Sequence, residues 1–424
     1  MASLQQRLLI ATLATTLAAA ADPPEKIRKQ EFHEFRDFIA KTFGRLGGRH
    51  AKDRVISAQN VDGHGEVPDS AWYENRHARR RMSVDELRRG PGDSSPPAHG
   101  PWKVVAAKRE GVTPGFQIED AHGRRYLLKF DPPEYPELVS GAEIISTKFF
   151  YALGYHVPEN YIVRFDRARL AAGTSTDSTD KPVREQDIDA ALALMPKDSR
   201  GQYRALASLM LAGEPLGPFF FSGTRKDDPE DTIPHEHRRE LRGLYIFSAW
   251  LNHTDAKAGN TLDMLVEHGG RRYIKHYLID FGATLGSASF EAKSPRQGYE
   301  HMLDLKPSLI QLVTLGAHVP KWARAKQAGI KAVGSFEAEA FDPDRWKPNY
   351  PNPAFENRLP EDSYWAARRV MAFTDEEIRA IVETAQYTDP RATEWITRTL
   401  IVRRDKIART FGESGLARVK GKLQ

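Results

Sequence analysis

The apolar positions of residues 101–211 form short runs of the kind that make strands. Four to seven β-branched, aromatic or aliphatic residues alternate or cluster, and segments rich in glycine, proline or aspartate separate the runs. One longer apolar stretch has the 3.6-residue spacing of a helix. The expected elements are strands at 102–108, 116–119, 124–130, 160–165 and 203–211, and a helix at 136–153. The polar segment 166–200, with a short helix at 184–194, is interpreted as a surface insertion.

Helical spacing dominates the second half of the chain. The segment 234–251 is mostly apolar, which predicts a buried helix. Two strands at 261–266 and 272–279 flank the turn Glu267-His-Gly-Gly270. Three amphipathic helices are expected after them, at 363–372, 374–387 and 390–409. The pattern therefore predicts an α+β chain, with a small antiparallel sheet and one helix first and a mostly helical part second.

The residues before the first strand are more polar. An amphipathic helix is predicted at 25–46, whereas 51–101 is irregular and 90–100 has the composition of a linker. We interpret 22–100 as an extension on the surface of the core domain, without an assigned function.

Composition and charge exclude several classes of protein. The 424 residues are 40% hydrophobic, enough for a sizeable core, and the net charge of +5 is too mild to suggest nucleic acid as a partner. No cysteine occurs, so disulfides, thiolate metal sites and thiol nucleophiles are excluded. The sequence contains no G-x-S-x-G motif, no H-E-x-x-H motif and no Walker A run, which are the motifs of α/β-hydrolases, zinc metalloproteases and P-loop nucleotide-binding proteins.

Residues 1–21 resemble an export signal. Arg7 is the only charge before an apolar run at 8–21, and the alanines at 18–21 offer cleavage sites for a signal peptidase. The run is short for a transmembrane helix, so no membrane span is expected in the mature chain. We therefore expect a periplasmic or secreted protein. The alternative is an ordinary apolar N-terminal helix on a cytoplasmic protein.

The densest group of candidate chemical residues lies between 253 and 282. The chain reads H-T-D-A-K-A-G-N at 253–260 and D-F-G at 280–282, on either side of the predicted hairpin. The order His-x-Asp-x-Lys-x-x-Asn, followed by D-F-G, resembles the catalytic loop and metal-binding motif of the protein-kinase-like superfamily. The alternative is a solvated turn in which Asp255 and Asn260 cap backbone groups.

The resemblance implies a role for each of these residues. Asp255 would accept the proton of an acceptor hydroxyl, and Lys257 would neutralise charge on the transferred phosphoryl group. Asn260 and Asp280 would hold Mg²⁺ or Mn²⁺ on ATP, since both supply hard oxygen ligands.

The resemblance extends to the first strands, which are arranged like the N-lobe of a kinase. Gly111 and Gly115 would let the backbone approach the nucleotide phosphates, although the loop departs from G-x-G-x-x-G. Lys129 would bind the phosphates, and Glu143 would pair with it. The alternative is that Glu143 forms a capping box with Ser140.

A hinge between the two lobes is expected where Ala212-Gly-Glu-Pro-Leu-Gly217 interrupts the apolar pattern. Backbone groups near Leu211 and Gly213 would contact adenine there. The resulting division gives an N-lobe at 101–212, with its insertion at 166–200, and a C-lobe at 213–415. Within the C-lobe, Arg225 and Lys226 are expected on a charged surface loop, with the alternative that they face a substrate.

The chain lacks the A-P-E signature of conventional protein kinases. This absence moves the resemblance toward the atypical branch, the HipA-like and phosphatidylinositol-kinase-like enzymes, and leaves the acceptor open among proteins, lipids and small molecules. The expected function is ATP- and Mg²⁺-dependent phosphotransfer to a hydroxyl. The alternative is an exported nucleotide-binding module that keeps the fold without turnover.

Overall fold

The computed structural model describes residues 56–93, 95–107, 115–173, 182–302 and 319–413. The export signal, the helix expected at 25–46 and Gly111 lie outside the described residues.

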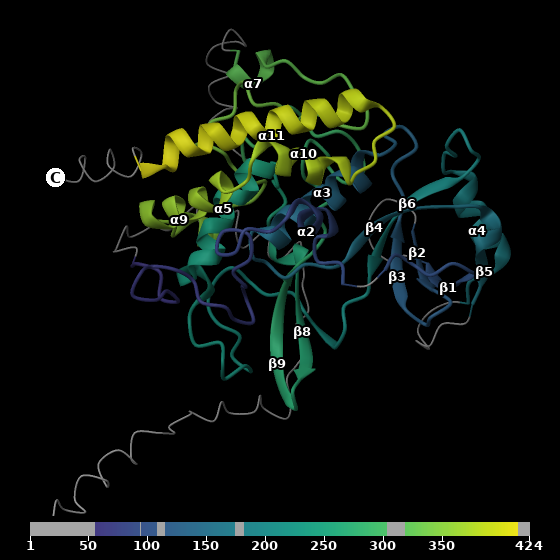
Figure 1. Ribbon diagram of the computed structural model, residues 1–424, viewed down its shortest axis with the longest axis horizontal. Helices are drawn as coiled ribbons and strands as arrows, with labels where there is room; N and C mark the ends of the chain where they lie inside the picture. Colours follow the sequence, from purple (N-terminus) through teal and green to yellow (C-terminus); the bar gives the residue numbers. More distant parts are fainter. Residues whose placement is uncertain (1–55, 94, 108–114, 174–181, 303–318, 414–424) are drawn as a thin grey trace, which may run out of the picture.

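A six-stranded sheet forms the first part of the fold, on the right of Figure 1. Its strand order is β4-β6-β3-β2-β1-β5, and every pairing is antiparallel except that of β1 with β5. The strands are β1 (Trp102–Ala107), β2 (Gly115–Glu119), β3 (Arg125–Lys129), β4 (Asn160–Phe165), β5 (Leu170–Ala172) and β6 (Tyr203–Leu209).

Alternation along β3 decides which side chains enter the core of this sheet. Tyr126 and Leu128 are fully buried, whereas Lys129 points to the opposite face. Helix α3 (Leu138–Ala152) packs against β4 and β6. The sheet thereby holds Lys129 and α3 in one rigid unit.

The segment 166–200 contributes more to this unit than a surface insertion would. It supplies β5, which pairs with β1, and helix α4 (Glu185–Ala193), whose Ile188 and Leu192 are buried in the core beneath the sheet. The apolar residues of this segment are scattered among Thr, Ser, Asp and Lys, which is why the sequence pattern suggested an insertion.

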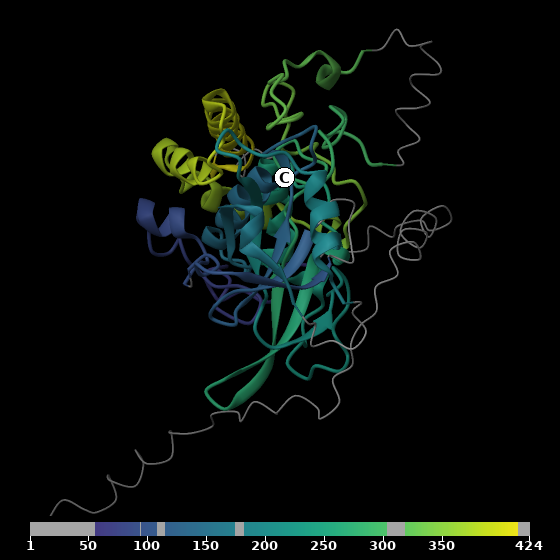
Figure 2. The ribbon, with the colours of Figure 1, turned by 90° about the vertical axis from the view of Figure 1, so that its right-hand side faces the viewer.

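A second sheet has the order β7-β8-β9, with β7 (Glu214–Gly217), β8 (Thr261–His268) and β9 (Arg271–Leu278). The β8–β9 hairpin projects from the rest of the molecule in both ribbon views (Figures 1 and 2). Strand β7 lies in the segment that we expected to be an irregular break. Its register brings the backbone of Gly213 so close to β8 that a Cβ atom there would lie 2.4 Å from the carbonyl oxygen of Leu265.

Helices make up most of the remaining chain. The central one is α5 (Arg239–Leu251), in which every residue is buried. It begins later than the predicted 234 because His235–His237 forms a separate 3₁₀ turn. The other helices of this part are α7 (Lys321–Arg324), α8 (Pro353–Glu356), α9 (Pro360–Met371), α10 (Asp375–Glu383) and α11 (Pro390–Phe411), of which α8, α9 and α11 contact α5.

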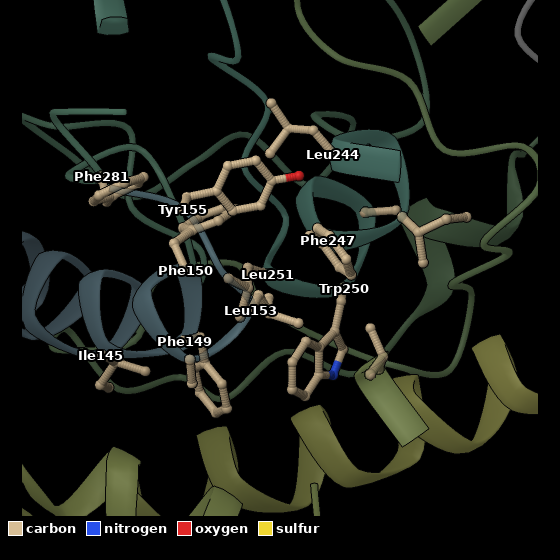
Figure 3. Packing of buried hydrophobic residues seen from close by; sticks show 14 of the residues in the cluster. Ile145, Phe149, Phe150, Leu153, Tyr155, Leu244, Phe247, Trp250, Leu251 and Phe281 are labelled. Carbon is tan, nitrogen blue, oxygen red and sulfur yellow. The ribbon is translucent and has the colours of Figure 1, made fainter. Parts of the chain in front are cut away.

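Helix α5 joins the two parts of the fold through its aromatic residues. Phe149 and Phe150 of α3 lie on one side of the core and Phe247 and Trp250 of α5 on the other (Figure 3). The rings of Phe149 and Trp250 meet edge to face at 4.7 Å. The predicted α+β arrangement, a sheet-containing first part followed by a mainly helical part, is confirmed, although the first sheet carries α4 in addition to the expected α3.

The described part of the N-terminal extension is not confined to the surface. Trp72, Tyr73 and Leu87 are buried in the main core, the last of them in helix α2 (Val84–Arg89). No helix in the described ranges is long and apolar enough to cross a bilayer.

Candidate active site

The end of β3, helix α3 and the residue that follows β9 meet at Lys129. Its Nζ lies 2.9 Å from Oε1 of Glu143 and 3.4 Å from Oδ1 of Asp280. The side chain of Glu143 is only 3% exposed, whereas that of Asp280 is 52% exposed. The lysine therefore joins a buried carboxylate, which orients it, to an accessible carboxylate that a ligand can reach.

Electrostatics keep Lys129 charged. Burial opposes the ammonium form, but the carboxylates of Asp280 and Glu143 outweigh it and raise the pKa of Lys129. A permanently cationic side chain of this kind suits phosphate binding.

The capping-box alternative for Glu143 is excluded by the start of α3. The helix begins at Leu138, with Glu137 at its N-cap in a left-handed conformation. Ser140 donates its backbone N–H and its hydroxyl to Asp131, at 2.8 and 2.6 Å. Glu143 is therefore left to face Lys129, as the ion-pair prediction required.

The loop 253–260, which we call the catalytic loop, starts directly after α5. Asn252 ends the helix in a left-handed conformation at φ 53°, and the backbone N–H of His253 returns to the carbonyl of Ser248 at 2.8 Å. Because α5 is buried throughout, the loop is held at a fixed point of the core.

Asp255 lies between two polar neighbours in this loop. Oδ1 is 3.4 Å from Nζ of Lys257, and Oδ2 accepts a hydrogen bond from Nδ2 of Asn260 at 3.0 Å. Burial raises the pKa of Asp255, with Lys257 and Asn260 acting in the opposite direction. A carboxylate with a raised pKa is a stronger proton acceptor than a surface aspartate, which is what a general base requires.

Asn260 and Asp280 come together through the register of the hairpin. Thr261 pairs with Leu278, and the N–H of Ile279 donates to the carbonyl of Asn260 at 3.0 Å, so the next residue, Asp280, lies beside Asn260. The amide nitrogen of Asn260 donates to Asp255, which leaves its oxygen for a ligand.

These two residues fit a divalent cation that is held partly by a nucleotide. They offer one carboxylate and one amide oxygen, both hard ligands of the type that Mg²⁺ prefers. Within the described ranges, no group of three or more His, Cys, Asp or Glu residues is suited to hold a metal by itself. Phosphate oxygens of ATP would have to complete the coordination.

The residues after Asp280 are packed tightly against α3. Phe281 is fully buried and stacks on Phe150 at 4.7 Å, with the two rings also shown in Figure 3. A Cβ atom on Gly282 would lie 3.0 Å from Cγ1 of Val139 and 3.4 Å from Oε2 of Glu143. The glycine therefore permits the close approach that brings Asp280 and Glu143 to the same lysine.

Two buried cations next to the catalytic loop were not predicted from the sequence. Nζ of Lys293 donates to the carbonyls of Asn252 and Ala283, at 2.6 and 2.7 Å. Arg403 of α11 donates to the carbonyls of Ala249 and Trp250, at 2.6 and 2.9 Å. Positive charge on either side chain is favoured by the negative end of the α5 dipole. Nothing in the local sequence marks them, because their partner carbonyls lie 10 and 41 residues from Lys293 and 153 and 154 residues from Arg403.

The remaining predicted residues lie near this group in the fold. Gly115 begins β2 directly opposite Lys129 in the sheet register. Leu211 and Gly213 lie in the short connection between β6 and β7, which links the two sheets as expected of a hinge. Contacts of these residues with a nucleotide stay predictions.

Arg225, which we had placed on a surface loop, is instead 3% exposed. Its guanidinium pairs with Asp263 at 3.0 Å, and Asp263 in turn contacts Nδ1 of His276 at 2.6 Å. The charged composition of its segment suggested solvent exposure, but the guanidinium pairs with Asp263 of β8 as well as with Asp227 of its own segment. Arg225 therefore supports the second sheet and does not face a substrate.

Comparisons with known proteins give structural likeness alone. No protein-family model matches the chain, and no curated protein does. Among solved structures, the chain is similar to the Helicobacter pylori proinflammatory kinase CtkA, with a TM-score of 0.40 and 13% identity over 78% of this chain and 100% of that chain. It is also similar to a golgi casein kinase, with a TM-score of 0.34 and 10% identity over 94% of each chain.

Proposed function

We propose that this protein is an ATP- and Mg²⁺-dependent phosphotransferase that acts on a hydroxyl group. The observation that carries the proposal is the convergence of Lys129, Glu143 and Asp280 with the catalytic loop. Four separate elements bring these groups together, and each group has the chemistry that phosphoryl transfer needs at its position.

Each residue of the candidate site has a defined part in this mechanism. Lys129, oriented by Glu143, binds the phosphates of ATP, and Asn260 and Asp280 hold the metal ion. The metal ion supplies positive charge to the phosphate oxygens. Lys257 faces the transferred phosphoryl group, and Asp255 orients the acceptor hydroxyl and takes its proton. Positioning and electrostatic stabilisation account for most of the rate.

The acceptor and the compartment belong to the same proposal. A protein, a lipid or a small molecule could present the hydroxyl, and we place the reaction in the periplasm or outside the cell because of the signal-like segment 1–21. Membership of the HipA-like or phosphatidylinositol-kinase-like branch rests on the absence of A-P-E and is proposed on that ground alone.

Asp255→Asn tests turnover separately from binding. The variant keeps the shape of the side chain and removes the proton acceptor, so phosphotransfer should fall by about 10²–10⁴. Affinity for MgATP should change by about threefold or less, since Asp255 contacts the acceptor and not the nucleotide. The assay is transfer of labelled phosphate from ATP to a lysate from the native host, with calorimetry for affinity.

The nucleotide-binding module without turnover is the competing outcome of this experiment. It would give tight binding of MgATP by the wild-type protein, with transfer no faster than that of Asp255→Asn across a broad set of acceptors. Absence of MgATP binding by the wild type would reject both functions.

A further inference from the structure

Helix α3, which carries Glu143, ends on carbonyl groups that need partners from elsewhere. The last carbonyls of any helix lack intrahelical donors, and leaving them buried and unpaired is costly. Here the donors come from the N-terminal extension. The backbone N–H of His77 donates to Ala152 at 3.2 Å, and that of Glu74 donates to Gly154 at 2.9 Å.

Arg76 contributes the strongest of these contacts. Its Nη1 donates to the carbonyls of Tyr151 and Tyr155, at 2.9 and 3.0 Å, and its guanidinium lies 4.1 Å from the centre of the Tyr151 ring. Glu74 pairs with the same guanidinium at 2.7 Å, and the side chain of Arg76 is 9% exposed. A cation at the carbonyl end of a helix is also favoured by the helix dipole.

A reciprocal contact joins the middle of α3 to the end of α2. Lys148 of α3 donates from Nζ to the carbonyl of Arg89 at 3.0 Å and to that of Arg88. Burial lowers the pKa of Lys148 to about 8. Gly90 lies directly on this side chain, since a Cβ atom there would be 2.8 Å from Cγ of Lys148.

The other side of the extension is attached to the helical part of the molecule. Arg81 pairs with Glu377 of α10 at 3.0 Å. The hydroxyl of Tyr73 accepts from Nε of Arg369 of α9 at 2.9 Å. The extension therefore lies between α3 and the helices α9 and α10, with hydrogen bonds or ion pairs to both sides.

We propose that residues 72–90 form a clamp that fixes the position of α3, and that Arg76 is its central positioning residue. Glu143 lies eight residues before Tyr151 on the same helix, about 12 Å along its axis. A shift at the clamped end would therefore move Glu143 relative to Lys129. The clamp keeps their contact formed within this one chain, without a separate activating partner.

Arg76→Ala in the full chain tests the clamp, with Arg79→Ala as the matched control. Arg79 belongs to the same segment, but its side chain is 73% exposed and, among the residues that the structure describes, pairs with Asp69 alone at 3.8 Å. Arg76→Ala should raise hydrogen-exchange rates of the α3 amides by roughly tenfold or more, because two charge-assisted hydrogen bonds are lost. Arg79→Ala should leave them unchanged. Equal exchange in α3 of wild type and Arg76→Ala would overturn the proposal.

A double-mutant cycle separates positioning of Glu143 from a general loss of structure. This part of the test rests on the proposed function, because its readout is MgATP affinity. Arg76→Ala should weaken affinity in the wild-type background but have little further effect in Glu143→Gln, since both changes act through Lys129. Additive losses would show that Arg76 acts by another route.

The clamp can be tested even if Arg76→Ala does not fold or the proposed function is wrong. If Arg76→Ala does not fold, Lys148→Met replaces it. This change removes the ammonium group, keeps most of the unbranched side chain, and should raise hydrogen-exchange rates in α3. If the wild type does not bind MgATP, the proposed function fails, whereas the exchange measurement still decides whether the clamp exists.

Discussion

Single residues decide the chemistry of the site through the charges that surround them. Asp280 is the only carboxylate among the two proposed metal ligands, and it also lies 3.4 Å from Lys129. Its backbone is left-handed at φ 58°, a conformation that is uncommon for residues other than glycine. Removal of this one side chain should therefore weaken metal binding and also remove one of the two carboxylates that contact Lys129.

Asp280→Ala should abolish most of the Mg²⁺-dependent part of ATP binding. Asn260→Ala should weaken it less, because the amide is neutral and contributes one weaker ligand. Titration calorimetry with ATP, in the presence and absence of Mg²⁺, would measure the difference. Equal and negligible effects of the two substitutions would reject the metal site.

Lys293 should make stability depend on pH in a window above neutrality. Burial lowers its pKa from 10.5 to about 7 in the folded protein. Between these two values the unfolded chain binds more protons than the folded one, so the free energy of unfolding rises with pH. From pH 7 to 8.5 the gain should be about 1–2 kcal/mol.

Lys293→Met provides the control for this titration, since it replaces lysine by an unbranched side chain of similar size that cannot ionise. Urea denaturation at several pH values should show the rise in the wild type and a flatter curve in the variant. Parallel curves for the two proteins would mean that Lys293 titrates outside this window.

At the scale of elements, α5 sets the position of the catalytic loop by close packing. Its Gly243 faces α9, where a Cβ atom would lie 2.7 Å from the ring of Trp365. Trp250 donates from its indole nitrogen to Leu400 of α11 at 2.9 Å. The approach of α5 to α9 thus depends on a missing side chain, and that of α5 to α11 on this hydrogen bond together with those from Arg403.

Gly243→Val should destabilise the protein by about 1–3 kcal/mol, since the added methyl groups would overpack the contact between α5 and α9. Gly63→Val is the matched control, because no atom lies within 4 Å of a Cβ at that exposed position. Chemical denaturation would compare the two. Equal stability of the two variants would show that the helices separate without cost.

At the scale of the whole molecule, the extension and the two parts of the fold form one connected structure. The described extension contributes Trp72 and Tyr73 to the main core, and Trp72 stacks on His276 of the second sheet at 3.5 Å. Removal of the extension up to residue 100 would therefore expose core residues in the part of the fold that carries the candidate active site.

Processing of the N-terminus is a prediction for the whole chain. If residues 1–21 are an export signal, the mature protein should begin near Ala21 or Asp22. N-terminal sequencing of protein from the native host measures this directly. Soluble cytoplasmic protein that retains Met1 would refute export.

Sequence alone determined the features that depend on near neighbours. Alternation placed Lys129 opposite the core-facing Leu128, and helical spacing identified the buried α5. The loop 253–260 and Asp280 lie within 28 residues of each other, so the hairpin between them fixed their proximity through its register. These predictions succeeded because periodicity and short loops constrain geometry locally.

Tertiary structure decided what depends on distant partners. Arg225 and Lys293 are charged residues in polar segments, and only the pairing with Asp263 and the carbonyls of Asn252 and Ala283 makes their burial possible. Strand β5 exists because β1 offers it an edge. The proposed clamp depends on the contact of Arg76 with the carbonyl of Tyr151 at the end of α3, 75 residues later in the chain. Local propensity carries no information on such contacts, because the free energy that stabilises them is gained only when both partners are already folded.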